Sequence, residues 1–67
     1  MIEVRVNGVE RELADGSTVA TLLVELGVPA AGVAVALNGV VVPRAGHERT
    51  PVPDGAVVEV LTAVQGG

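Results

Sequence analysis

Two Asn-Gly dipeptides constrain the fold of this chain more than any other feature. Asn7-Gly8 and Asn38-Gly39 each stand between short runs of residues with high strand propensity. A two-residue hairpin turn that matches the twist of its strands needs positive φ at both central positions, and Asn and Gly tolerate that conformation best. Each dipeptide therefore predicts a β-hairpin, one over residues 2–13 and one over residues 33–42.

The strands of the two hairpins differ in their patterns. In the first strand Ile2, Val4 and Val6 alternate with polar residues, which is the period of a strand with one buried face. Residues 9–13 place Arg11 on the less polar face, so we expect an edge strand. Residues 33–37 are apolar on both faces, which favours an interior strand or one beside a partner surface.

Between the hairpins the period changes to that of a helix. One helical face collects apolar side chains at i, i+3, i+4 and i+7, namely Val19, Leu22, Leu23 and Leu26. Ser17 or Thr18 can cap the first turn, while Gly27 and Pro29 suit its end. A helix this short, roughly eight to ten residues, is stable only when its apolar face packs on the sheet.

Residues 44–55 are rich in turn residues, which predicts a loop. The segment "AVVEVLTAV" that follows predicts a last strand, with Val58 and Val60 on one face. The order is β-β-α-β-β-β. We predict an α+β protein with the β-grasp (ubiquitin-like) fold, a mixed sheet of four to five strands packed on one main helix. Its last strand would lie parallel to the first, in the middle of the sheet, and this order rests partly on resemblance to that superfold. The domain would span residues 1–62, followed by a flexible tail over 63–67.

Composition excludes several classes of function. The 67 residues contain no cysteine and no aromatic residue, so a disulfide and a Cys-ligated metal are impossible and the core must be aliphatic. The net charge is −4 and four dispersed arginines supply all the positive side chains, which argues against nucleic acid. An acidic surface suits a basic partner or simply maintains solubility. No apolar run is long enough for a membrane and no basic leader is present, so we expect a cytoplasmic protein.

Side-chain chemistry is scarce. The lone His47, beside Glu48 in a loop, is expected to be solvated surface, and no metal site is expected. Ser17 is better explained as a helix cap than as a nucleophile. The Gly67 carboxylate remains: it could attack ATP to form an acyl-adenylate, and glycines can enter a narrow channel. Six extended residues beyond the strand would reach about 20 Å into another protein. A frayed end is the alternative.

Along its whole length the chain resembles the ThiS family of sulfur carriers from thiamine thiazole synthesis. The resemblance is carried by "NG" in the first turn, "STVATLLVELG", "VALNGVVVPR", "VPDGAVVEVL" and the tail "AVQGG". The small subunits of molybdopterin synthase also end in Gly-Gly, usually after a proline, whereas here no proline follows Pro53.

The resemblance implies a carrier protein that is not itself an enzyme and binds no cofactor. An E1-like adenylyltransferase of the ThiF type, using ATP and Mg²⁺, would activate Gly67, and sulfur from a cysteine desulfurase would convert it to a thiocarboxylate. A ThiG-type thiazole synthase would receive that sulfur. Val64, Gln65 and Gly66 would guide the tail into both partners. The alternatives are another sulfur carrier of the molybdopterin-synthase type, a ubiquitin-like protein modifier, or a β-grasp interaction module with an inert tail.

Overall fold

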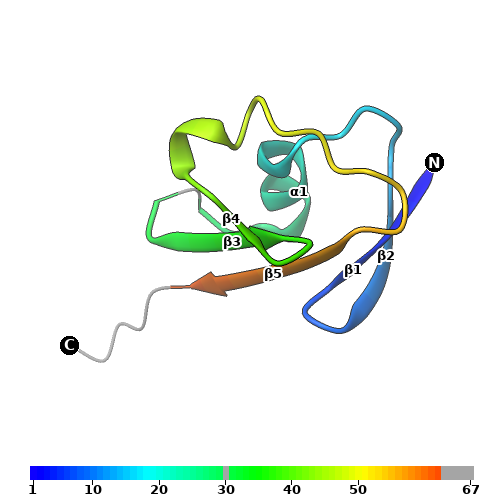
Figure 1. Ribbon diagram of the computed structural model, residues 1–67, viewed down its shortest axis with the longest axis horizontal. Coiled ribbons are helices and arrows are strands. Elements are labelled where there is room, and N and C mark those ends of the chain that lie inside the picture. The colour runs from blue at the N-terminus through cyan, green and yellow to red at the C-terminus, as the bar shows by residue number, and fades with distance from the viewer. Residues whose placement is uncertain (30, 63–67) are drawn as a thin grey trace.

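A computed structural model describes residues 1–29 and 31–62 of the chain (Figure 1). In these residues a five-stranded sheet packs against an α-helix. The elements are β1 (Ile2–Val6), β2 (Val9–Leu13), α1 (Val19–Leu26), β3 (Val33–Leu37), β4 (Val40–Val42), the short 3₁₀ helix η1 (Arg44–Gly46) and β5 (Val57–Thr62).

Both predicted hairpins are confirmed. Val6 pairs with Val9 across the first turn, and Leu37 pairs with Val40 across the second, so each turn has two residues. Asn7 and Asn38 have φ of 51° and 50°, and the glycine after each has φ of 83°. These are the positive values that make Asn-Gly the favoured sequence in such a turn.

The strand order in the sheet is β2-β1-β5-β3-β4, which confirms the β-grasp arrangement with five strands. β5 lies parallel to β1, with Val6 opposite Val58, and antiparallel to β3 over its length. As the sequence predicts, β2 is an edge strand, and β3 is an interior strand. The last strand along the chain is therefore the middle strand of the sheet.

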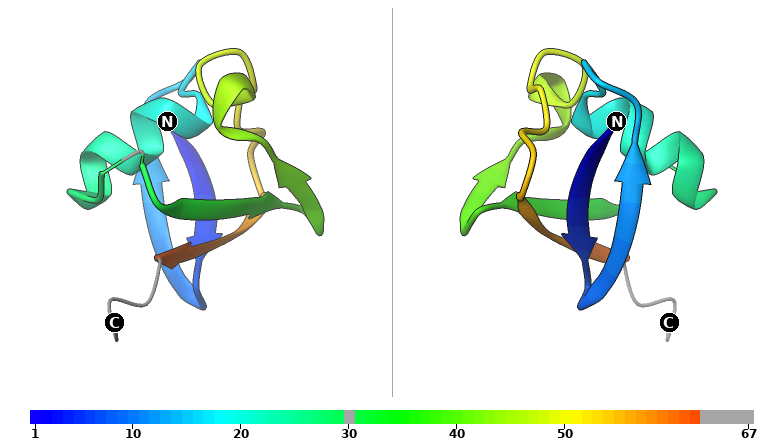
Figure 2. Two further views of the ribbon diagram at one scale, coloured as in Figure 1. Left: turned by 90° about the vertical axis from the view of Figure 1, so that its left-hand side faces the viewer. Right: turned by 90° about the vertical axis from the view of Figure 1, so that its right-hand side faces the viewer.

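The helix covers one face of the sheet, and the segment after η1 lies on the same side (Figure 2). Val19, Leu22 and Leu23 of α1 are buried, as the periodicity predicts. Thr18 is the cap, since its side chain accepts a hydrogen bond from the Thr21 N–H, whereas the buried Ser17 hydroxyl donates to the Ala14 carbonyl at 2.7 Å. The core is aliphatic, consisting of Val4, Val6, Leu13, Val19, Leu22, Leu23, Val35, Val42, Val52, Ala56, Val58 and Val60.

The expectation that His47 is solvated surface is wrong. Only 3% of His47 is exposed, although Glu48 beside it is exposed. Its carbonyl accepts the Ala20 N–H at 3.0 Å, and the Thr50 carbonyl accepts the Val19 N–H at 3.0 Å. The first N–H groups of a helix need acceptors from outside the helix. The loop supplies them, and this draws His47 into the interior.

Candidate functional site

The predicted reactive tail follows directly from the middle strand of the sheet. Gly67 and the recognition residues Val64, Gln65 and Gly66 lie outside the described residues. The structure describes the chain leading to them as far as Thr62, the last residue of β5. The described part of the site is therefore the end of β5, together with the contacts that fix this strand and the open face of the sheet around it.

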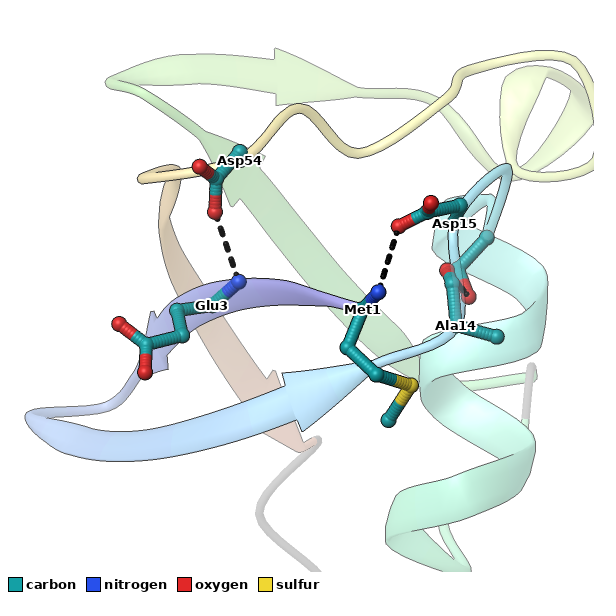
Figure 3. A network of polar contacts seen from close by, with 6 residues as sticks. Met1, Glu3, Ala14, Asp15 and Asp54 are labelled. Carbon is teal, nitrogen blue, oxygen red and sulfur yellow. Dashed lines mark hydrogen bonds and ion pairs between the residues drawn. The ribbon is translucent and has the colours of Figure 1, made fainter.

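The segment before β5 is attached to β1 by a pair of hydrogen bonds at Glu3. The Glu3 N–H donates to a carboxylate oxygen of Asp54 at 2.8 Å, and the Gly55 N–H donates to the Glu3 carbonyl at 2.6 Å. Figure 3 shows the Asp54 contact beside an ion pair between the Met1 ammonium and Asp15, whose atoms are 3.0 Å apart. Asp15 and Asp54, each of which precedes a glycine in a turn, thus also bind the N-terminal segment of the chain.

Two asparagine side chains contact the backbone of β5. The Asn7 amide both accepts from the Val60 N–H at 2.9 Å and donates to the Val60 carbonyl at 3.0 Å. The Asn38 side-chain oxygen accepts from the Val57 N–H at 2.9 Å. The sequence indicated these residues only as turn formers. No local pattern could reveal the bonds between Asn7 and Val60, because the partners are 53 positions apart.

The sheet face opposite the helix carries an apolar strip, which we define as Ala34, Ala36, Val41, Val57 and Leu61. Residues paired directly across neighbouring strands have side chains on the same face. Ala34 pairs with Leu61, and Ala36 pairs with Val41, so the strip runs over β3, β4 and β5. The large side chains are open to solvent, with exposures of 71% for Val41, 67% for Leu61 and 49% for Val57.

The same face is charged over β1 and β2. Glu3 pairs with Glu12, and Arg5 pairs with Glu10, whose carboxylate lies 3.2 Å from the Arg5 guanidinium. All four of these residues are exposed. An exposed ion pair of this kind contributes little to stability. The open face is thus mainly apolar over β3, β4 and β5, where the exposed Glu59 opposite Ala36 is the exception, and it is charged over β1 and β2.

Other chemistry is sparse among residues 1–29 and 31–62. The Ser17 hydroxyl is engaged with a backbone carbonyl, and the His47 ring lies in the interior, with Nε2 3.2 Å from the Val42 carbonyl. No three His, Asp or Glu side chains of these residues come together as a metal site would require. Over the same residues, no helix has both the length and the apolar character needed to cross a membrane.

Comparison with known proteins agrees with this architecture. The chain is 38% identical to the thiamine biosynthesis protein ThiS from Geobacter metallireducens, whose crystal structure it matches with a TM-score of 0.82 over 98% of this chain and 100% of that one. A solution NMR structure of a thiamine biosynthesis protein from the same organism gives the same identity and TM-score, with 88% of that chain covered.

A thiazole synthase from Paramagnetospirillum magneticum is 39% identical over 62 residues, which cover 92% of this chain. The chain spans only 19% of the length of that relative. The model of the ThiS family matches residues 4–67, almost the whole sequence and including its Gly-Gly end. With the β-grasp fold and the open sheet face beside β5 established, this match shows that the chain belongs to the ThiS family.

Proposed function

We propose that this protein is a sulfur carrier in the biosynthesis of the thiazole moiety of thiamine. The observation that carries the proposal is the match to the ThiS family over residues 4–67, which includes Gly66 and Gly67. The fold supports it, because β5 is the middle strand of the sheet and ends at Thr62, five positions before Gly67 in the sequence. A small domain with a thin C-terminal extension can present a carboxylate inside another protein while its body stays outside.

The proposed chemistry takes place at Gly67. A carboxylate oxygen attacks the α-phosphorus of ATP, which releases pyrophosphate and forms an acyl-adenylate. A persulfide sulfur then attacks the acyl carbon and displaces AMP, and a thiol cleaves the resulting acyl disulfide to leave a thiocarboxylate. The chain contains no cysteine, so its side chains offer no thiol to carry the sulfur. The terminal carbonyl is the place where this protein would carry it.

In this proposal the chain is a co-substrate of partner enzymes and not an enzyme. An E1-like adenylyltransferase of the ThiF type binds the ATP and Mg²⁺, and a cysteine desulfurase provides the sulfur. The acceptor is a thiazole synthase of the ThiG type, which is supported by the ThiS-like sequence found within a protein named thiazole synthase. We propose that these steps take place in the cytoplasm and that Val64, Gln65 and Gly66 guide the tail into both enzymes.

The apolar strip is the proposed docking surface for the activating enzyme. It lies next to the end of β5, so a partner that binds it also receives the tail. Exposed valine and leucine side chains gain free energy when a partner removes them from water. The exposed acidic residues over β1 and β2, together with Glu59 on β5, suit a basic rim on the partner, which would mainly raise the association rate.

Mass spectrometry of the intact protein tests the function. The protein is incubated with ATP, Mg²⁺, a ThiF-type enzyme and a desulfurase with cysteine, and we expect the mass to rise by the difference between one sulfur and one oxygen. A variant lacking Gly67 serves as the control and should remain unchanged. The proposal fails if the full chain gains no sulfur, or if the variant without Gly67 is adenylated and thiolated equally well.

A further inference from the structure

We propose that Asn7 is a positioning residue, whose side-chain amide holds the end of β5 and thereby directs the carrier's tail. This inference rests on the proposed function, since it concerns how the reactive terminus is presented. Asn7 is far from the tail in sequence and belongs to the turn of the first hairpin. Its contact with the strand that leads to the tail is a product of the tertiary fold.

The Asn7 side-chain amide continues the hydrogen bonding between β1 and β5 beyond the point where the two strands stop pairing. β1 pairs with β5 only as far as Val6 opposite Val58, and the Asn7 N–H then donates to the Val58 carbonyl at 2.9 Å. The next polar groups along this edge of β5 are the N–H and carbonyl of Val60. The Asn7 side chain accepts from that N–H at 2.9 Å and donates to that carbonyl at 3.0 Å.

β1 itself cannot make these contacts, because its chain reverses at Asn7 to form the hairpin with β2. The φ of 51° at Asn7 begins that reversal. A carboxamide has the same donor and acceptor as a peptide group, so it can extend the ladder by one pair after the backbone has left it. β5 is thus held on both edges at Val60, because β3 pairs with its other edge through Thr62.

The contact fixes the last part of β5 that lies in the core. The Val60 side chain is 7% exposed and packs in the core, while Leu61 and Thr62 are exposed. When both edges of a strand end are hydrogen-bonded, the strand end has one orientation relative to the sheet. When a single edge is hydrogen-bonded, the strand end can adopt more conformations. Those extra conformations must be lost when an enzyme binds the tail, which weakens binding.

Asn38 is a matched control residue for Asn7. It occupies the same position of an identical Asn-Gly turn with φ of 50°, and its side chain contacts β5 at Val57, the start of the strand. Glycine tolerates positive φ, so Asn7→Gly and Asn38→Gly both preserve their turns while removing the side-chain hydrogen bonds. The two variants differ mainly in which end of β5 they release.

Amide hydrogen exchange tests the contact directly. In N7G the Val60 N–H should exchange about tenfold faster or more, relative to the Leu22 N–H in the helix, because local opening now exposes it. In N38G the ratio should stay near that of the native protein. Asn7→Asp is a second variant, which keeps the hydrogen-bond acceptor and removes the donor. The exchange rate of its Val60 N–H should lie between those of the native protein and N7G. Val60 exchange in N7G and N7D as slow as in the native protein would overturn the proposal.

The kinetics of adenylation by the ThiF-type enzyme test the positioning role. N7G should raise the KM for the carrier about three- to tenfold and leave kcat within about twofold, since binding and not chemistry carries the ordering cost. N38G should change KM less than about twofold by the same reasoning. Equal KM values for N7G and N38G would overturn the role of Asn7 in directing the tail. If the native chain is not adenylated at all, the proposed function fails, and the exchange measurements still decide whether Asn7 holds β5.

Discussion

Side chains take the place of peptide groups at both ends of the contact between β1 and β5. Asp54 accepts the Glu3 N–H before the strands pair, and Asn7 binds both polar groups of Val60 after they separate. The type of each residue was predictable as a turn former, because turn chemistry is local. The hydrogen bonds were not, since they join residues more than 50 positions apart.

The burial of His47 likewise could not be predicted from the sequence. A histidine beside Glu48 in a loop rich in turn residues is typical of solvated surface, and no periodicity contradicts that interpretation. In the structure its ring is enclosed. Because a carbonyl only accepts, the contact with Val42 places the ring hydrogen on Nε2 and leaves a buried Nδ1 without a partner among the described residues.

Replacing His47 with alanine is expected to destabilise the protein by about 2–3 kcal/mol, through the cavity left in the core and the unpaired Val42 carbonyl. Glu48→Ala is the matched control on the next, exposed residue and should change the free energy of unfolding by less than about 0.5 kcal/mol. Urea denaturation measures both. Equal stabilities of H47A and E48A would contradict the enclosed position of the ring.

At the scale of elements, the helix was the most predictable part of the chain. Its apolar face, its length of eight residues and the glycine at its end follow from the sequence pattern. Of the groups that bind the first N–H groups of the helix, only the Thr18 side chain was predictable from the sequence. Thr18 is local, but the His47 and Thr50 carbonyls come from a loop without periodicity, in which Val52 is also buried.

Gly27→Ala is expected to cost about 1 kcal/mol, because alanine is strained in the left-handed conformation. Gly27 has φ of 74° at the helix C-cap, and a Cβ there would meet nothing within 4 Å, so the cost is in the backbone alone. Gly46→Ala is the control: its Cβ would make ordinary contacts at 3.6 and 3.8 Å, so its stability should change by less than about 0.5 kcal/mol. Thermal unfolding of both variants checks this, and a G46A loss as large as that of G27A would contradict it.

At the scale of the whole molecule, the position of β5 decides how the protein can work. Local patterns predict a strand within "AVVEVLTAV", residues 56–64, and the structure describes β5 over Val57–Thr62. The parallel pairing of this strand with β1 is non-local and was expected partly from resemblance to a known superfold. Once β5 occupies the middle of the sheet, its exposed residues Val57 and Leu61 join those of β3 and β4 in the apolar strip. The tail residues 63–67 lie outside the described structure, so their roles remain predictions.

The proposed docking role of the apolar strip can be tested without disturbing the fold. The double variant V41T/L61T keeps side chains suited to strands and replaces apolar surface by hydroxyls on residues that are more than half exposed. If an activating enzyme covers both, each change removes about 1 kcal/mol of apolar burial, so the KM for adenylation should rise about tenfold or more.

Val24→Thr makes the same chemical change on α1, across the sheet from the strip, at a valine that is 79% exposed. It should leave KM within about twofold, since a residue outside the interface contributes little to binding. Circular dichroism and urea denaturation should show that all variants remain folded. A rise in KM for V24T as large as that for V41T/L61T would place the docking surface on the helix face. An unchanged KM for the double variant would leave the tail as the principal element that the activating enzyme recognises.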